Sequence, residues 1–533
     1  CLDGTAMTSA PGPIFEIGTV GKNKVDDKLI SSRLVATALP KITVDGEKKI
    51  LRIPFDGSPA GVPLKGDIKF TIGAGPDMLM ELNLIQAASE TITPTVNFPV
   101  MRGMKLGRLE DTWYLWCRRG GVISNIDCRQ AQLTGHYALQ VADIFNPKAK
   151  GGLALLTYDT ENIMRAWHMK KDNGGVSWHL EYLAQEYAPG EKIETVPTAL
   201  RAHTGDWRTA LNIYKQWLDS WYKPITSRRE WLKKLFYYQQ VSIRGQLDPK
   251  QTGGPWAVED VVQHYRDYFG CLDYLHIFDL GASEKYGRVG NYTDYNDQER
   301  KIILDGIRKI QGMGVRTGFY IEGYLCDNRS KWGKANIEKS GARQKNNSLK
   351  SWSAKVPYEI YMCSAAPAWR DYLVEMFKTT SADFKPDGIY LDQYGHIRTP
   401  LTCWSHEHGH RVPLSVLKGE QGTMTRLRKA TPPETIILTE ETPNDFNSQL
   451  YDGALSYASA HTDPGISPSR FDLFRFVIPG FKRFELVQYN KSLEGAWNRL
   501  KFPFFNGMGY WMHGDTNNRY CEDAHQFLKK VFA

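Results

Sequence analysis

The chain has 533 residues and a mass of 60.7 kDa, and at about 100–200 residues per domain this length suggests two to four domains or one large barrel with attachments. Apolar residues make up 41% and charged residues 24%, an ordinary globular composition that excludes a disordered chain. No run approaches about 18 uninterrupted apolar residues, so no membrane-spanning helix is predicted. The net charge of +8 is not concentrated in basic blocks, which disfavours a nucleic-acid partner and suits an anionic polymer substrate.

The amino-terminal residues indicate an exported protein. The chain begins Cys-Leu-Asp-Gly without an initiator Met, the pattern of a bacterial lipoprotein whose Cys1 carries a lipid after removal of a signal peptide. The alternative is a chain trimmed at an arbitrary point. We expect a periplasmic protein or one anchored to the outer membrane of a bacterium through Cys1.

Residues 1–202 have the pattern of an antiparallel β-sandwich. Short β-type runs alternate with Gly and Pro, and long helical periodicity is absent. The runs are Lys49–Pro54, Asp67–Ile72, Thr91–Phe98, Thr112–Cys117, Leu153–Tyr158 and Val176–Glu181. The eight cysteines include no CxxC pair, and only Cys117 and Cys128 are candidates for a disulfide, across a hairpin.

Helical periodicity begins after residue 202. Trp207, Leu211 and Tyr214 recur at helical spacing, and Pro224 ends the pattern. This pattern predicts a linker helix within residues 203–225 that packs one domain on the next.

Residues 226–533 alternate strands with helices, which predicts a (β/α)8 barrel. The predicted strands are Leu235–Ile243, Leu272–Leu280, Val315–Tyr324, Gly388–Asp392, Thr435–Thr439, Gly453–Tyr457, Phe484–Gln488 and Phe504–Trp511. The clearest helices are Val258–Phe269, Asp297–Met313, Pro367–Thr379, Ser492–Leu500 and Cys521–Phe532. A doubly wound sheet would bring a Gly-rich phosphate turn after its first strand, and none is present.

Carboxylates end four consecutive predicted barrel strands, the second to the fifth. They are Asp279, Glu322, Asp392 and the pair Glu440–Glu441. The carboxyl ends of barrel strands carry the reactive groups in such folds. Cleavage of a glycosidic bond needs two carboxyl groups, one that attacks or activates water and one that protonates the leaving oxygen.

The fourth and fifth strands supply the candidate catalytic pair. Asp392 and one of Glu440 and Glu441 come from neighbouring strands, and a separation of about 5–6 Å is natural there and predicts a retaining mechanism. The strand pleat points only one of the two glutamates inward. Asp463, after the sixth strand, is an alternative acid.

The segments that follow carry a family resemblance. They are GDWRTALNIY at 205–214, DGIYLDQ at 387–393, the loop 403–410, and TEE followed by YDGALSY at 451–457. Together they resemble a glycosidase group with an uncharacterised domain, similar to glycoside hydrolase families 129 and 101. The resemblance covers about residues 150–515 and is strongest at the DQ strand.

The resemblance has implications for roles and substrate. It implies that Asp392 is the nucleophile and that a glutamate on the fifth strand is the acid/base, with Glu441 favoured over Glu440 by its distance to the YDG motif. It implies α-linked galactose-type substrates, either α-N-acetylgalactosaminides or the α-linked 3,6-anhydrogalactose of carrageenan-type polymers.

The loop 402–411, TCWSHEHGHR, admits three interpretations. His406 and His410 formally satisfy the zinc-protease motif HExxH, which works only on a helix, whereas Gly409 and the neighbouring prolines disfavour a helix here. The second interpretation is a substrate-binding loop in which Trp404 stacks on sugar and the histidines bind hydroxyls. The third is a structural metal site that uses Cys403 and these histidines.

The sequence therefore predicts an exported, retaining, exo-acting glycoside hydrolase with an amino-terminal β-sandwich and a (β/α)8 barrel. The predicted substrate-binding residues are Asp279, Glu322, Gln393, Tyr394, Trp404, His408, His410, His461 and Asp463. No organic cofactor and no assigned metal site are predicted, although a structural calcium is compatible with the sequence. The alternatives are a zinc-dependent hydrolase built on His406 and His410, or a non-catalytic surface glycan-binding protein.

Overall fold

The structure is a computed structural model. It describes residues 13–19, 35–36, 39–58, 63–73, 75–118, 120–133, 137–225, 229–241, 257–278, 289–395, 402–414, 416–456, 472–487, 493–513 and 522–532. The chain forms two compact units: the first runs to Tyr222 and includes Arg411–Pro413, and the second begins at Lys223. The expectation of a lipid on Cys1 lies outside the described residues.

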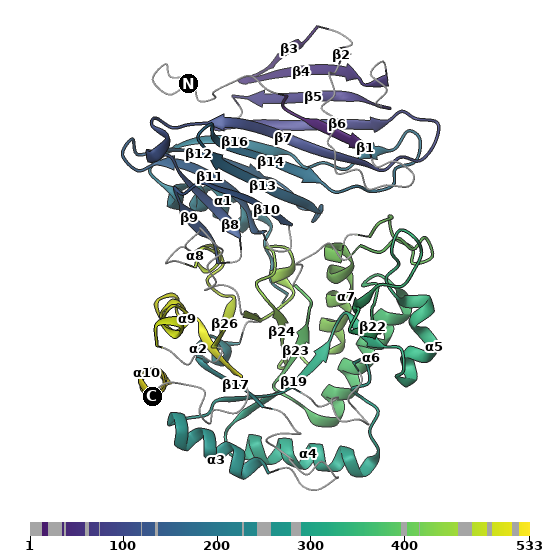
Figure 1. Ribbon diagram of the computed structural model, residues 1–533, viewed down its shortest axis with the longest axis vertical. Helices are drawn as coiled ribbons and strands as arrows, with labels where there is room; N and C mark the ends of the chain where they lie inside the picture. Colours follow the sequence, from purple (N-terminus) through teal and green to yellow (C-terminus); the bar gives the residue numbers. More distant parts are fainter. Residues whose placement is uncertain are drawn as a thin grey trace. The chain divides into compact units, whose positions relative to one another are not determined.

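The first unit contains two antiparallel sheets, which confirms the predicted β-sandwich (Figure 1). The smaller sheet has the order β1 (Glu16–Thr19), β7 (Pro94–Met104), β14 (Gly175–Tyr182), β13 (Arg165–Asp172) and β10 (Cys128–Leu133). The larger sheet has the order β2 (Val35–Ala36), β4 (Lys48–Asp56), β5 (Leu64–Ile72), β6 (Asp77–Gln86), β16 (Thr198–Thr204), β12 (Gly151–Thr157), β11 (Tyr137–Asn146), β8 (Trp113–Arg118) and β9 (Val122–Ser124), with β3 (Lys41–Asp45) on β4 and β15 (Lys192–Ile193) on β6.

Aromatic side chains fill the core of the first unit. Trp167 and Trp178 are buried on the smaller sheet, and Trp116 and Tyr137 are buried on the larger one. The rings of Tyr137 and Trp167 stack with centroids 4.4 Å apart, so the two sheets are joined directly by an aromatic contact. Cys117 lies on β8 and Cys128 on β10, in different sheets, and both are free thiols, so the disulfide suggested by the sequence is not formed.

Helix α1 (Trp207–Trp221) confirms the helical periodicity seen after residue 202. The side chain of Asp206 caps it by accepting a hydrogen bond from the backbone N–H of Arg208. Its apolar face buries Leu211 and Tyr214 against β11 and β12. The helix therefore belongs to the first unit, which ends at Tyr222.

The second unit contains a closed barrel of eight strands, every pair of which is parallel, and this confirms the predicted barrel fold. Its strands are β17 (Tyr237–Val241), β18 (Tyr274–Ile277), β19 (Arg316–Glu322), β23 (Gly388–Asp392), β24 (Ile436–Glu440), β25 (Gly453–Ser456), β26 (Lys482–Val487) and β27 (Gly509–His513). A small separate sheet has the order β20 (Leu325–Asp327), β22 (Val356–Tyr361) and β21 (Ser351–Ser353).

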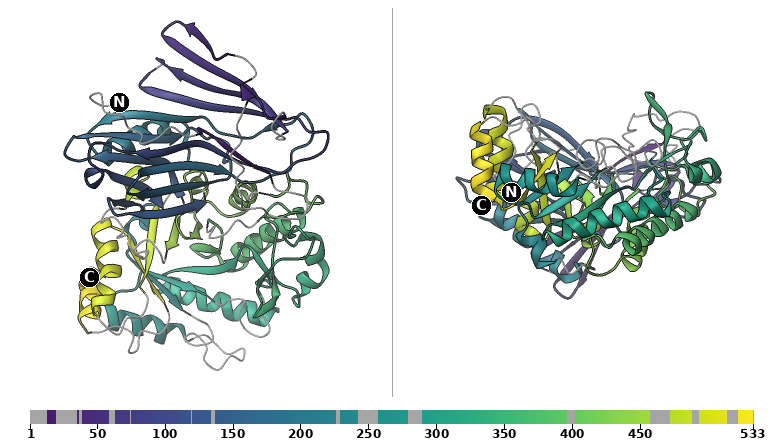
Figure 2. Two further views of the ribbon diagram at one scale, coloured as in Figure 1. Left: turned by 45° about the horizontal axis from the view of Figure 1, so that its top comes forward. Right: turned by 90° about the horizontal axis from the view of Figure 1, so that it is seen from below.

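The helices of the second unit surround the barrel strands (Figure 2). They are α2 (Glu230–Lys234), α3 (Val258–Phe269), α4 (Asp297–Gly312), α5 (Lys331–Ser340), α6 (Pro367–Phe384), α7 (Val416–Ala430), α8 (Leu473–Val477), α9 (Leu493–Asn506) and α10 (Glu522–Phe532). The predicted strand Phe504–Trp511 begins too early, because α9 continues through Pro503 to Asn506. No described helix combines the length and the apolar character that crossing a bilayer requires.

Large aromatic side chains fill the barrel interior. Tyr238 and Tyr274 stack with ring centroids 4.6 Å apart, and Tyr390 belongs to the same buried cluster. Gly318 and Gly388 flank the hydroxyl of Tyr274, which a Cβ at either position would meet. The interior is therefore a packed floor beneath the carboxyl ends of the strands.

Candidate active site

Three carboxyl groups occupy the last positions of three consecutive barrel strands. Glu322 ends β19, Asp392 ends β23 and Glu440 ends β24. Glu322 pairs in register with Asp392, and the pairing of Leu391 with Thr439 places Glu440 next to Asp392. Neighbouring strands are about 4.8 Å apart, so the three groups share one end of the barrel, the end at which such folds carry their active sites.

The strand pleat places all three carboxyl groups on the interior side of the barrel. Side chains two residues apart on a strand lie on the same face. Tyr320, Tyr390 and Leu438 lie in or against the interior cluster, and each stands two residues before a carboxyl group. Glu322, Asp392 and Glu440 therefore continue the interior rows to the barrel mouth.

Two tyrosine hydroxyls hold Asp392. Tyr320 donates to Oδ2 at 2.6 Å, and Tyr390 donates to Oδ1 at 2.6 Å. Each carboxylate oxygen thus has its own donor, which fixes the plane of the group and stabilises its ionised form. Asp392 remains half-buried, whereas Glu322 and Glu440 are buried.

Burial raises the pKa of Asp392 to about 6, and the negative charge of Glu440 adds to the rise. The hydrogen bonds from Tyr320 and Tyr390 act in the opposite direction because they favour the carboxylate. Asp392 is therefore mostly ionised at neutral pH and takes up a proton only slightly below it. A buried carboxylate with this behaviour is typical of a reacting group.

The surroundings of Glu322 favour its protonated form. Burial, followed by the charges of Asp392 and Glu440, raises the pKa of Glu322 well above its usual range. Its Oε1 accepts the backbone N–H of Tyr324 at 2.8 Å, and its Oε2 lies 3.1 Å from the hydroxyl of Tyr320. Since that hydroxyl gives its single proton to Asp392, a protonated Glu322 completes the chain by donating toward Tyr320.

Glu440 and Glu441 lie on opposite sides of the strand. Glu441 is buried, has a φ of 57°, and accepts the hydroxyl of Ser456 at 2.9 Å on the neighbouring strand β25. Glu440 instead follows Leu438 on the interior face, and its charge acts on Asp392. The contacts of Glu441 are thus with β25, whereas the interior row of β24 leads to Glu440, and the choice of the acid between them stays a prediction.

The two residues that follow Asp392 have different surroundings. Gln393 is half-buried with a φ of 62°, so the backbone turns directly after the carboxylate. Tyr394 is fully buried and its ring stacks on Tyr324 with centroids 4.5 Å apart. Tyr394 supports the loop and does not reach a sugar, since no part of it is exposed. Asp279, His461 and Asp463 lie outside the described residues.

The loop of residues 402–414 is not helical, which removes the basis of the zinc-protease interpretation. Residues 406–410 form turns and bends, and Gly409 has a φ of 69°. His406 is exposed, whereas Nε2 of His410 lies 3.5 Å from Sγ of Cys363. The HExxH spacing therefore does not create a helical zinc motif, because its two histidines have different surroundings.

The histidines expected to bind sugar face cysteines instead. His408 is buried, with Nδ1 3.4 Å from Sγ of Cys403. His410 faces Cys363, as described above. Trp404 is half-buried, and Nζ of Lys345 lies 5.4 Å from the centroid of its ring. One ring nitrogen of each histidine thus faces a sulfur atom, and the sugar-binding roles of His408 and His410 stay predictions.

Tyr320 and Tyr390 are the site residues that sequence reasoning missed. Their signal is present in the strings FYIE and IYLD, in which a tyrosine stands two residues before a strand-end carboxylate. Further along the interior, Nε1 of Trp511 donates to Oε1 of Gln240 at 2.9 Å. These polar contacts line the same end of the barrel and were not predicted.

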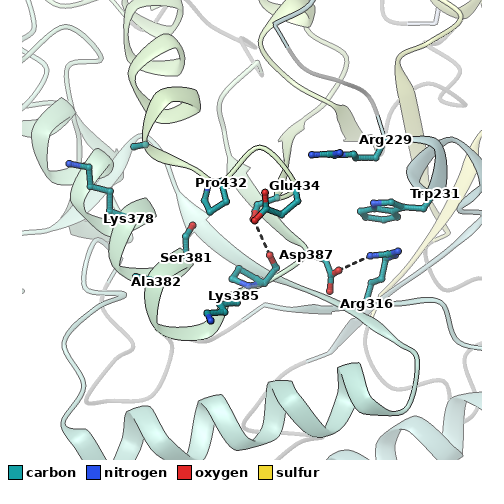
Figure 3. A pocket seen from close by; sticks show the side chains of 13 residues that line it. Arg229, Trp231, Arg316, Lys378, Ser381, Ala382, Lys385, Asp387, Pro432 and Glu434 are labelled. Atoms are coloured by element: carbon teal, nitrogen blue, oxygen red, sulfur yellow. Dashed lines mark hydrogen bonds and ion pairs between the residues drawn. The ribbon is translucent and has the colours of Figure 1, made fainter.

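A pocket of about 750 Å³ lies at the opposite end of the barrel. Its charged lining includes Arg229, Lys378 and Glu434, and Arg316 pairs with Asp387 at 2.8 Å (Figure 3). Arg316 begins β19 and Asp387 immediately precedes β23, so these residues mark the amino-terminal ends of the strands. That face stabilises barrels, and the pocket is not the candidate site.

Comparison with known proteins places the barrel among glycosidase folds. Residues 194–446 match a family described as a domain of unknown function, DUF6259. A putative glycoside hydrolase of Bacteroides thetaiotaomicron is 25% identical over 278 residues, which cover 48% of this chain and 39% of that protein. The chain thus spans about two fifths of the length of this curated relative.

Two solved structures extend the likeness to almost the whole chain. The α-N-acetylgalactosaminidase NagBb from Bifidobacterium bifidum, in complex with GalNAc, has a TM-score of 0.72 at 12% identity, covering 98% of this chain and 87% of that one. The α-galactosidase AgaA from Geobacillus stearothermophilus has a TM-score of 0.53 at 12% identity, covering 98% and 75%. The resemblance noted in the sequence is confirmed, and at these identities the solved structures show a shared fold.

Proposed function

We propose that this chain is a glycoside hydrolase in which Asp392 is the nucleophile and Glu440 is the acid/base. The observation that carries the proposal is the placement of these two carboxyl groups at the ends of neighbouring parallel strands, on the interior side. Carboxyl groups about 5–5.5 Å apart support double displacement with retention, and side chains on adjacent strand ends can adopt that spacing.

The two carboxyl groups differ in what stabilises their charge. Asp392 accepts two tyrosine hydroxyls, which favour the carboxylate that a nucleophile must be. Glu440 stands beside that charge in a buried position, where a like charge is costly. The proposed reaction needs Asp392 as the carboxylate and Glu440 with its proton.

The reaction runs in two balanced steps. An oxygen of Asp392 attacks the anomeric carbon, the glycosidic C–O bond breaks, and Glu440 gives its proton to the leaving oxygen. Glu440 then takes a proton from water, the resulting oxygen attacks the same carbon, and Asp392 leaves as the carboxylate. Two inversions at one carbon give net retention.

The proposed substrate is an α-linked galactose-type sugar at the end of a glycan, either GalNAc or 3,6-anhydrogalactose. The support comes from the named activities of the structural relatives, an α-N-acetylgalactosaminidase and an α-galactosidase. The net charge of +8 supports a sulfated or otherwise acidic glycan. Export to the periplasm or the outer membrane is part of the same proposal, because such polymers are met outside the cell.

The test is a substrate screen with the purified chain. We expect turnover of aryl α-galactosides, aryl α-N-acetylgalactosaminides or oligosaccharides cut from carrageenan, with the α-anomer as the first product seen by proton NMR. Loss of turnover in Asp392→Asn, with glycan binding retained, supports the assignment. A β-anomer as the first product, or glycan binding without turnover of any of these substrates, would overturn it.

A further inference from the structure

A second group of chemistry-bearing side chains lies apart from the carboxylates. Cys363, Cys403, His408 and His410 each offer one ligand atom, and these atoms all lie within 4.8 Å of one another. The first three residues are buried and His410 is half-buried. No role in sugar cleavage uses these four residues, although the loop that carries three of them follows the strand of Asp392.

The spacing of the ligand atoms matches a tetrahedral metal. Sγ of Cys403 lies 3.4 Å from Nδ1 of His408, and Sγ of Cys363 lies 3.5 Å from Nε2 of His410. With Zn–S bonds of about 2.3 Å and Zn–N bonds of about 2.0–2.1 Å, a tetrahedral zinc separates its ligand atoms by about 3.3–3.8 Å. The two sulfur–nitrogen distances fall within that range.

The backbone holds both cysteines in place before any ligand binds. Cys363 donates its backbone N–H to Ser340 at 2.9 Å. Cys403 pairs with Leu414 across an isolated bridge, in which Leu414 donates to the carbonyl of Cys403 at 2.9 Å. The positive φ of Gly409 turns the chain between the two histidines. The site is therefore preorganised by contacts that do not involve its ligand atoms.

His408 has the outer contact that a metal-binding histidine usually has. Its Nε2 lies 3.0 Å from the carbonyl oxygen of Lys339, which only accepts hydrogen bonds. Nε2 therefore carries the proton, and Nδ1 is left with its lone pair directed at the cysteines. A backbone carbonyl on the far nitrogen is the common partner that orients such a histidine.

The sulfur atoms are also suited to a cation. Two thiolates neutralise the charge of a divalent ion, and thiolate sulfur together with imidazole nitrogen is a donor set that zinc prefers.

We propose that Cys363, Cys403, His408 and His410 bind one Zn²⁺ as a structural site. Zinc binds the two cysteines as thiolates, so their protons pass to water and a neutral Cys₂His₂ centre results. Four protein ligands fill a tetrahedral shell, so this ion has no open position for catalysis. It joins the segment after β22 to the loop after β23, and so fixes the chain next to the strand that ends at Asp392.

The first experiment measures metal in the full chain, purified without chelator. We expect about one zinc per chain by elemental analysis. Exchange with Co²⁺ is expected to give the intense visible bands of tetrahedral cobalt together with thiolate-to-cobalt charge-transfer absorption. The spectrum reports the type of the metal ligands in the wild-type chain, so it is informative even if a variant fails to fold. It does not depend on enzymatic activity.

Variants then assign the ligands. Cys403→Ser and His408→Ala are expected to reduce bound zinc at least tenfold, the scale on which site residues act. Cys326→Ser and His406→Ala are the matched controls, a buried cysteine and a loop histidine outside the group, and both are expected to keep zinc. Chelation is expected to lower the thermal midpoint of the wild type and not that of Cys403→Ser.

The competing chemistry is a disulfide between the two cysteines. A metal-free chain in which Cys363 and Cys403 are joined, seen by mass spectrometry after alkylation without reductant, would overturn the proposal. Zinc that persists in Cys403→Ser, or cobalt without thiolate bands, would do the same. A zinc-loaded chain that cleaves no sugar leaves the metal proposal standing and contradicts only the proposed function.

Discussion

The hydroxyl of Tyr390 lies 2.6 Å from Oδ1 of Asp392, the residue two positions further along the same strand. The strand pleat fixes this pair, because alternate side chains project to the same side. Removing the hydroxyl in Tyr390→Phe takes away a bond that favours the carboxylate, so the pKa of Asp392 rises further. We expect the acidic limb of the pH–rate profile to move up by about 0.5–1 pH unit, with a loss of kcat/KM of about 10-fold. An unchanged acidic limb would show that the hydroxyl does not act through Asp392.

Replacing Asp392, the proposed nucleophile, is expected to stop the first chemical step. Asp392→Asn removes the charge and keeps the shape, so kcat should fall by at least about 10³-fold. Asp371→Asn, at an exposed position on α6 of the same unit, is the control and is expected to keep activity. Initial rates on an aryl glycoside measure both. Activity of Asp392→Asn within tenfold of the wild type would contradict the assignment.

The two adjacent glutamates give a matched pair for the acid. Glu440→Gln removes a proton donor, so we expect a loss of about 10²–10⁴-fold on substrates with poor leaving groups and a much smaller loss on activated aryl glycosides. Glu441→Gln keeps an oxygen that accepts from Ser456 and is expected to retain the leaving-group dependence of the wild type. The reverse pattern between these two variants would return the acid role to Glu441.

Burial of Asp392 has a consequence for stability. Its pKa rises from 3.8 to about 6 on folding, so between these pH values the folded state binds more protons than the unfolded state. Below pH 3.8 Asp392 is protonated in both the folded and the unfolded chain, so its raised pKa does not lower the free energy of unfolding. As the pH rises to about 6, the carboxyl group ionises more readily in the unfolded chain, and the free energy of unfolding falls. Asp392→Asn is therefore expected to stabilise the protein at pH 7.5, by at most about 3 kcal/mol, and not at pH 3.5.

The dependence on pH distinguishes this prediction from a general change in packing. The asparagine amide nitrogen cannot accept a tyrosine hydroxyl, which reduces the gain at every pH. The pH-dependent part remains, so thermal midpoints of wild type and variant should converge as the pH falls. Parallel curves across the whole range would mean that Asp392 titrates alike in the folded and unfolded chains.

The protonated state of Glu322 makes glutamine its close replacement. Glu322→Gln keeps an oxygen for the backbone N–H of Tyr324 and a donor toward Tyr320, so activity within about tenfold of the wild type is expected. Glu322→Leu leaves the N–H of Tyr324 buried without its acceptor, at a cost of about 1–3 kcal/mol. Denaturation midpoints and kcat measure the pair. A glutamine variant as inactive as Asp392→Asn would show that Glu322 acts as a carboxylate.

The barrel was predictable because its signals are local. Each strand is a short apolar run, and α3 occupies the predicted residues Val258–Phe269 because both its apolar spacing and Gly270 mark its limits. Helix α7 was missed because Gly419 and Gly422 weaken its helical pattern, and Gly419 is required by the approach of Ser364. The helix predicted to end at Leu500 continues through Pro503 to Asn506.

The site was predictable at its strands and not in its loop. A carboxylate at the end of an apolar run marks the barrel mouth, which identified Asp392 and left Glu440 and Glu441 to be separated by the pleat. His410 contacts Cys363, which is 47 residues away in the chain, and no local sequence pattern predicts that contact. The loop could therefore be interpreted only from its residue types, whereas its contact with Cys363 depends on tertiary packing.

The carboxyl groups of Glu322, Asp392 and Glu440 stand on the strands themselves, and this has an evolutionary consequence. The distance between attacking and donating groups is set by hydrogen-bonded backbone, which mutation of the surrounding loops leaves in place. If the proposed roles hold, loops that recognise a glycan could change while the strand-borne carboxyl groups stay in place. A change of polysaccharide substrate would then leave the two reacting carboxyl groups in place.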